Sequence, residues 1–132
     1  MSVIKSIMIN EGFSAQPYFD TAGKLTIGYG RNLDDNPLTT DEAIYLLQND
    51  VAKIEKKLMV YSWFNQSSES VRDVLLEMAY NIGISGLLQF KNMIAAIKNE
   101  DYNAAAAEML NSKWAKQVGN RAVKLSEGMK NG

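Results

Sequence analysis

The stretch from Glu11 to Gly30, which reads EGFSAQPYFDTAGKLTIGYG, constrains the fold of this chain more than any other segment. It contains a short apolar run, then Gly23 at a position typical of a left-handed turn, then a segment in which large residues alternate with threonine and glycine. This order predicts two short antiparallel strands joined by a tight turn. The alternation predicts that the large residues pack inward and that Thr26 faces open space, where a ligand could lie.

A short helix is expected just before this hairpin, over residues 2–11. Apolar residues recur at helical spacing at Ile4, Ile7 and Met8, and the glycine after Glu11 is a typical helix stop. Glu11 follows these three residues by seven, four and three positions, which places it on the apolar face of the helix. A carboxylate there is expected to be partly desolvated, which favours its neutral, proton-donating form.

Two carboxylates and a hydroxyl therefore come from separate elements of one region: Glu11, Asp20 and Thr26. Glycosidic hydrolysis requires one carboxyl group that gives a proton and a second that helps a water molecule to attack. The chain of 132 residues has no cysteine and no histidine, which leaves carboxylates as the main acid–base groups. Disulfides, thiolate or histidine zinc sites, and catalysis by serine–histidine or cysteine–histidine pairs are excluded. We expect neither a metal nor a cofactor.

Everything after residue 38 is expected to be helical. Thr39 and Glu42 form a T-x-x-E capping box that opens a long helix, and Asp50 lies on or beside the apolar stripe of that helix. Further helices are expected over about 68–82 with Gly83 as the C-cap, over 92–98, over 101–110 with Asp101 as the cap, and from Asn120 onward. The fold class is α+β, in one domain over residues 1–132. A small antiparallel β-lobe covers about 13–38, and a larger helical lobe covers about 39–132 together with the N-terminal helix.

The charge pattern and the hydropathy restrict the partners. The formal net charge is −1 without a basic block, so the electrostatic footprint of a nucleic-acid-binding protein is missing. No segment approaches the length of an apolar membrane span, and the amino terminus lacks the long apolar run of a secretory signal. We therefore expect a monomer that is made in the cytoplasm, binds no nucleic acid and does not insert stably into a membrane.

The hairpin residues match the pattern of a known family. Glu11, eight residues, Asp20, five residues and Thr26, within EG…Y-x-D-x-x-G-x-x-TIGYG, resemble the bacteriophage-type lysozymes of glycoside hydrolase family 24. The segments LTTDEAIYLLQNDV, MAYNIGISGLLQF and SKWAKQVGNRA resemble later parts of the same family, in the family's order. The resemblance covers nearly the whole chain.

This resemblance implies a substrate cleft between the β-lobe and the helical lobe. It also implies hydrolysis, with inversion, of the β-1,4 bond between N-acetylmuramic acid and N-acetylglucosamine in peptidoglycan glycan strands. Glu11 would be the general acid. Asp20 would stay ionised and position the attacking water or stabilise the oxocarbenium-like transition state, and Thr26 would help to hold that water.

Further residues carry over by position. Arg121 matches the family's arginine that approaches the catalytic glutamate. Positions that line the family's cleft correspond to Asn32 on the sheet side and to Tyr80, Asn81, Met93 and Glu108 on the helical side.

Arg31 stands where the family usually has a histidine that pairs with an aspartate aligned with Asp50. We therefore predict an Arg31–Asp50 ion pair.

Two other readings stay open: a lytic transglycosylase, and a non-catalytic peptidoglycan-binding or structural domain. The Asp20–Thr26 pair argues against the first, because that reaction adds no water. The acidic run 34–36 is expected to form a turn rather than a calcium site, and Trp63 and Phe64 are expected to pack in the protein rather than to stack on sugars.

The biological setting follows from the resemblance to endolysins. It implies that the protein stays in the host bacterial cytoplasm until a separate holin releases it, and that it then acts in the periplasm. A lysozyme domain of a phage tail and a prophage copy stay open as alternatives.

Overall fold

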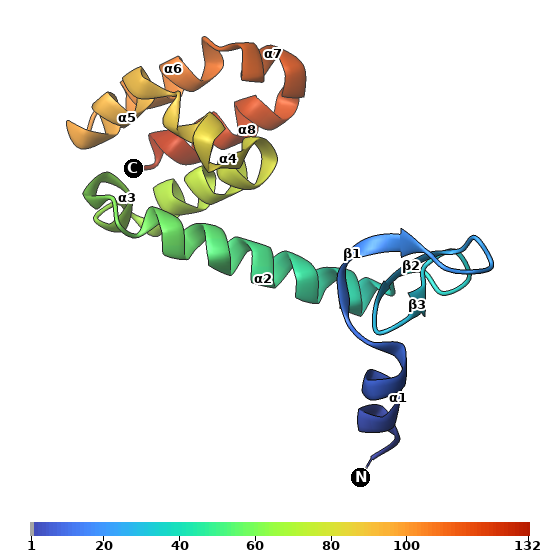
Figure 1. Cartoon of the computed structure of the whole chain (residues 1–132). Coiled ribbons are helices and arrows are strands. Elements are labelled where there is room, and N and C mark those ends of the chain that lie inside the picture. The colour runs from blue at the N-terminus through green and yellow to red at the C-terminus, as the bar shows by residue number, and fades with distance from the viewer. Residues whose placement is uncertain (1) are drawn as a thin grey trace. The chain divides into compact units, whose positions relative to one another are not determined.

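The computed structural model describes residues 2–132, and its elements alternate little: a helix, three strands and then only helices (Figure 1). In chain order they are α1 (Val3–Glu11), β1 (Ser14–Phe19), β2 (Leu25–Gly28), β3 (Arg31–Asn32), α2 (Thr40–Leu58), α3 (Ser62–Asn65), α4 (Glu69–Leu88), α5 (Lys91–Lys98), α6 (Tyr102–Leu110), α7 (Lys113–Val118) and α8 (Asn120–Lys130). The three strands form one antiparallel sheet in the order β1-β2-β3. The predicted α+β class is confirmed.

The contacts between residues separate two units, one ending at Leu46 and the other running from Leu47 to Gly132, so that the boundary falls inside α2. The first unit contains α1 and the sheet. The second contains α3 to α8.

In the first unit, α1 begins and ends where the sequence predicts. The Ser2 hydroxyl accepts a hydrogen bond from the Lys5 amide at 3.3 Å, and Gly12, with a φ of 71°, ends the helix. The predicted hairpin is present as β1 and β2, with Tyr18 paired to Thr26. The third strand, β3, was not predicted because two residues are too few to show an alternation.

The start of α2 is fixed by the predicted capping box. The Thr39 hydroxyl accepts a hydrogen bond from the Glu42 amide at 3.2 Å, and the Glu42 carboxylate accepts one from the Thr39 amide at 2.8 Å. The two bonds satisfy donors that the first turn of a helix would otherwise leave unpaired.

The second unit is built around α4. Its N-cap, Ser68, accepts a hydrogen bond from the Val71 amide at 3.2 Å. Gly83 interrupts the helix with φ 80° and ψ 162°, as predicted, but the helix resumes at once and continues to Leu88. Asp101 caps α6, also as predicted. The short helices α3 and α7 were not predicted as separate elements.

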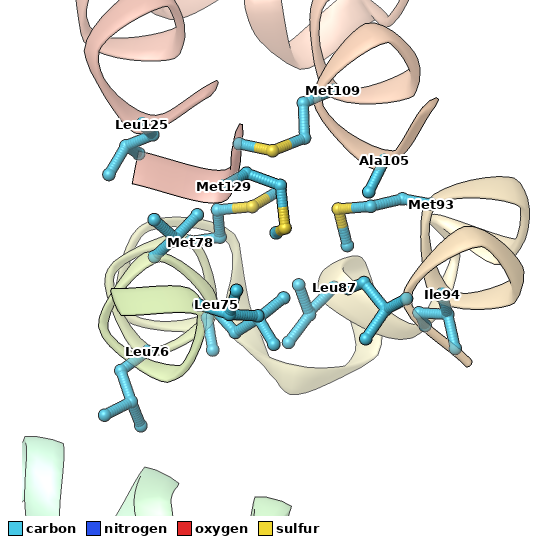
Figure 2. Close-up of a cluster of buried hydrophobic side chains, with 14 of the residues drawn as sticks. Leu75, Leu76, Met78, Leu87, Met93, Ile94, Ala105, Met109, Leu125 and Met129 are labelled. Atoms are coloured by element: carbon cyan, nitrogen blue, oxygen red, sulfur yellow. The ribbon is translucent and has the colours of Figure 1, made fainter. Parts of the chain in front are cut away.

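The core of the second unit is rich in methionine (Figure 2). Met78, Met93, Met109 and Met129 come from α4, α5, α6 and α8, and all four are fully buried. Their flexible thioether side chains point toward the same central space, where they fill the gaps between helices of different direction. Trp63 and Phe64 are buried in this core too, which confirms their predicted packing role.

None of the helices within residues 2–132 combines the length and the apolar character that crossing a bilayer requires.

Candidate active site

Glu11 is the last residue of α1, and its carboxylate lies against the backbone of Gly30 in the turn between β2 and β3. A Cβ atom added to Gly30 would stand 2.8 Å from Cδ of Glu11 and 3.2 Å from its Cγ, and still closer to Oε2. The Glu11 side chain is nevertheless exposed, and α1 contains no buried residue. Nothing within the first unit itself covers Glu11, so its expected desolvation stays a prediction. Helical spacing gives the direction of a face but not what covers it.

An aromatic pair joins the chain after Glu11 to the turn that contains Gly30. The rings of Phe13 and Tyr29 have their centroids 5.3 Å apart and are tilted by 47°. Next to this pair, Ser14 is paired with Gly28 in the β1–β2 ladder. The end of α1 is thus attached to the sheet by an aromatic contact and a strand pairing.

Asp20 lies in the turn between β1 and β2, and its carboxylate organises that turn. Oδ1 accepts hydrogen bonds from the amides of Ala22 at 2.9 Å and Lys24 at 2.8 Å. The main chain of Asp20 also donates to the Lys24 carbonyl oxygen at 2.9 Å. These bonds fix the orientation of the half-buried carboxylate and leave Oδ2 for other donors, such as a water molecule.

Thr26 is buried, with an exposed fraction of 2%, so the prediction that it faces open space is wrong. It lies on the central strand, and its cross-strand partners are Tyr18 on β1 and Asn32 on β3, on the same face of the sheet. Its hydroxyl donates to the Lys24 carbonyl oxygen at 2.9 Å. The hydroxyl oxygen keeps acceptor capacity, so it can still receive a hydrogen bond from water.

Asn32 uses both ends of its side-chain amide within the loop that follows β3. Nδ2 donates to the Asp35 carboxylate at 2.9 Å, and Oδ1 accepts from the Asp35 amide at 3.1 Å. Asp34 accepts a hydrogen bond from the Leu25 amide at 2.8 Å. The acidic run 34–36 thus forms a turn that closes onto the sheet, as predicted.

Arg31 pairs with Glu42 and not with Asp50, so the predicted ion pair is wrong. The guanidinium contacts both carboxylate oxygens of Glu42, with Nη2 at 2.9 Å from Oε1, and also donates to the carbonyl oxygens of Asn36 and Pro37. Glu42 lies in the first turn of α2, two turns nearer to the loop than Asp50, and the capping box already holds its carboxylate in place. These partners lower the pKa of Glu42 from 4.5 to about 2, the Arg31 hydrogen bonds contributing most and the Thr39 bonds next.

In the second unit, Tyr80 and Arg121 line one pocket of about 430 Å³. The Arg121 guanidinium donates to the Glu77 carboxylate from the same pocket, with Nε at 3.0 Å from Oε2. Sequence reasoning missed Glu77, because nothing in the pattern links two residues that are 44 positions apart. The predicted approach of Arg121 to Glu11 joins residues of different units and stays a prediction.

Met93 and Glu108 line a different pocket of the second unit, of about 420 Å³, with Trp114 and Phe90 in its wall. The Trp114 indole donates to the side-chain oxygen of Asn81 at 2.8 Å and packs edge-on against Phe90, with centroids 6.0 Å apart. Met93 is fully buried, whereas Glu108 is half-buried. The structure therefore separates the four predicted helical residues: Tyr80 in one pocket, Met93 and Glu108 in another, and Asn81 bonded to its wall.

Across residues 2–132, no three acidic side chains come together in a way that would hold a metal ion.

Comparison with known proteins shows similarity to one family over nearly the whole chain. The sequence profile of the family described as Phage lysozyme matches residues 9–131. The pre-baseplate central spike protein Gp5 of Enterobacteria phage T4 is 26% identical over 155 aligned positions, which cover 96% of this chain but 27% of the spike protein. Two proteins of Dictyostelium discoideum, probable T4-type lysozymes 1 and 2, are 24% and 22% identical. The first alignment covers 95% of this chain and 92% of the relative, and the second covers 88% and 86%.

Proposed function

This chain belongs to the phage lysozyme family, and we propose that it hydrolyses the β-1,4 bond between N-acetylmuramic acid and N-acetylglucosamine in peptidoglycan, with inversion at the anomeric carbon. Relatives described as probable lysozymes support a muramidase-like hydrolase at the level of the family. The bond and the stereochemistry are part of the proposal.

The observation that carries the proposal is the hydrogen bonding of the Asp20 carboxylate. Two backbone amides donate hydrogen bonds to Oδ1, which orients the group, while Oδ2 remains available. In the proposed mechanism, Asp20 accepts a hydrogen bond from the attacking water or stabilises the positive charge that develops on the sugar.

Glu11 supplies the proton. It donates to the leaving glycosidic oxygen, because an alkoxide is a poor leaving group unless it is protonated as the bond breaks. Thr26 contributes its hydroxyl oxygen as an acceptor for the attacking water, which its donation to the Lys24 carbonyl leaves possible. Asn32 in the first unit and Tyr80, Asn81, Met93 and Glu108 in the second are the proposed contacts to the glycan strand, and Arg121 is proposed to act on Glu11.

The proposed setting is lysis of a bacterial host. The protein would be made in the host cytoplasm, released by a holin late in infection, and active in the periplasm as a monomer. The similarity to a pre-baseplate central spike protein of a phage supports a second setting, in which the domain opens the wall at infection. Detection of the chain in purified phage particles would favour the second setting, and its absence there together with holin-dependent lysis would favour the first.

The reaction is tested by digesting purified peptidoglycan and analysing the muropeptides by mass spectrometry. Reducing muramic acid ends are expected, whereas anhydromuramic ends would show a lytic transglycosylase. Glu11→Gln is expected to lower the rate by about 10²–10⁴-fold. Glu55→Gln is the matched control, because Glu55 is an exposed glutamate of α2. Equal rates for the two variants would contradict the role of Glu11, and an undigested wall would contradict the enzyme itself.

A further inference from the structure

Gly30 is close to Glu11 in a way that the catalytic assignment alone does not require. The space that a side chain at position 30 would occupy is filled by the Glu11 carboxylate, whose Cδ would stand 2.8 Å from an added Cβ. Non-bonded carbon atoms pack at about 3.5–4.0 Å, so the two groups exclude one another. Because Gly30 has a hydrogen atom where other residues have a side chain, the Glu11 carboxylate can occupy this space.

We propose that Gly30 is the positioning residue of Glu11: the bare backbone of the β2–β3 turn is the surface against which the catalytic carboxylate comes to rest. This inference rests on the proposed function. It adds a residue that touches the general acid, without reacting itself, and that sets where the proton is delivered.

The aromatic pair supplies an independent reason for the close approach. Phe13 follows the helix end at Gly12 by one residue, and Tyr29 precedes Gly30 by one residue. Because their rings are in contact at a centroid distance of 5.3 Å, the segment after Glu11 and the turn containing Gly30 are held together. The carboxylate of Glu11, although exposed, is therefore held next to Gly30.

Conformation alone does not account for this role, as a comparison with Gly28 shows. Gly30 and Gly28 both have a left-handed backbone, with φ values of 72° and 69°, so a side chain strains both positions in the same way. A Cβ on Gly28, however, would meet nothing within 4 Å. Both glycines therefore have the same left-handed backbone, but only Gly30 has the Glu11 side chain beside it.

The expected effect of a side chain at position 30 is displacement of Glu11, not loss of the fold. The atoms that would be struck belong to the far end of a flexible, exposed side chain, which can rotate away. A shift of about 1 Å in a catalytic group can cost about 10²-fold in rate.

The first test compares Gly30→Ala with Gly28→Ala on a soluble muropeptide oligomer. We expect the kcat of Gly30→Ala to fall by about 10²-fold with little change in KM, while Gly28→Ala keeps a kcat near that of the wild type. The thermal midpoints of the two variants should fall by similar amounts, because the backbone strain is the same. Equal losses of kcat, or no loss in either variant, would overturn the proposal.

A second readout does not depend on activity. In protein with ¹³C-labelled glutamate, the Glu11 side-chain carboxyl signal is assigned by its disappearance in Glu11→Gln. We expect Gly30→Ala to move this signal and Gly28→Ala to leave it in place. An unmoved signal in Gly30→Ala would overturn the positioning role. If the wild-type protein hydrolyses nothing, the proposed function fails, whereas this measurement still decides the role of Gly30.

Discussion

Among the described residues up to Leu46, Thr26 is the one buried residue, whereas every buried hydrophobic side chain lies in the unit from Leu47 onward. The first unit is held instead by hydrogen bonds of side chains to backbone: Asp20 in its turn, Asp34 on Leu25, and Arg31 on the loop before α2. The second unit is held by packing around its methionines. This difference indicates that substitutions in the first unit act mainly on chemistry and those in the second mainly on stability.

The largest expected effect is on the stability of the second unit. Phe64→Ala removes a fully buried ring and should lower the free energy of unfolding by about 3–5 kcal/mol, as measured by urea denaturation. Phe19→Ala is the matched control in the first unit, because the Phe19 ring is 74% exposed. It should change the free energy of unfolding by less than about 0.5 kcal/mol. Comparable losses for the two variants would break the contrast between the units.

The next effect concerns chemistry in the first unit. Asp20→Asn keeps an oxygen for the turn but removes the charge, so the rate of hydrolysis should fall by about 10²-fold or more while the thermal midpoint stays close to that of the wild type. Asp41→Asn, at an exposed aspartate of the same unit, should keep the rate. An active Asp20→Asn enzyme would remove Asp20 from the mechanism.

A smaller effect should come from relief of strain in the second unit. Glu100 follows the end of α5 and has a φ of 56°. Its amide donates to the Ile97 carbonyl oxygen at 2.9 Å, and the Asp101 amide donates to the Ala96 carbonyl oxygen at 2.9 Å. This is the position that glycine favours at a helix end. Glu100→Gly should therefore stabilise the protein by about 0.5–1 kcal/mol, which is the relief of left-handed strain less the added chain entropy of glycine. Asn99→Gly, at a residue with an ordinary φ of −91°, should not, and a loss of stability in Glu100→Gly would contradict the assignment.

The smallest effect is the pH response of the hydrogen-bonded first unit. The pKa of Glu42 is about 2 in the folded protein and 4.5 ordinarily, so the folded state favours the charged form. The stabilisation from its bonds is fully present above pH 4.5 and is lost as the pH falls through about 2. A carboxyl ¹³C titration should show this midpoint. Arg31→Gln should raise it more than Thr39→Ala, because Arg31 contributes most. A midpoint near 4.5 in the wild type would contradict the pair.

The sequence predicted the elements that have local signals. The capping box of Thr39 and Glu42, the cap at Asp101 and the break at Gly83 all depend on neighbouring residues, and all are confirmed. The short elements β3, α3 and α7 were missed because they are too short for an apolar pattern to repeat within them.

The errors at the candidate site have related causes. Strand alternation places Thr26 in open space because it does not reveal the neighbouring strand β3. The family resemblance places Asp50 beside Arg31, whereas the loop brings the guanidinium to Glu42. The contacts of Glu77 with Arg121 and of Asn81 with Trp114 depend on the packing of distant helices, which no local pattern encodes.

The most direct test of the central claim, that the carboxylates of the first unit hydrolyse a glycosidic bond with an added water, is the anomer first released from a defined muropeptide oligomer. Proton NMR during the first turnovers distinguishes the α and β reducing ends before they interconvert. We predict that the α-anomer appears first, from attack of water on the face opposite the leaving group of a β-linkage. Initial release of the β-anomer, or of an anhydro-sugar without a reducing end, would contradict the account.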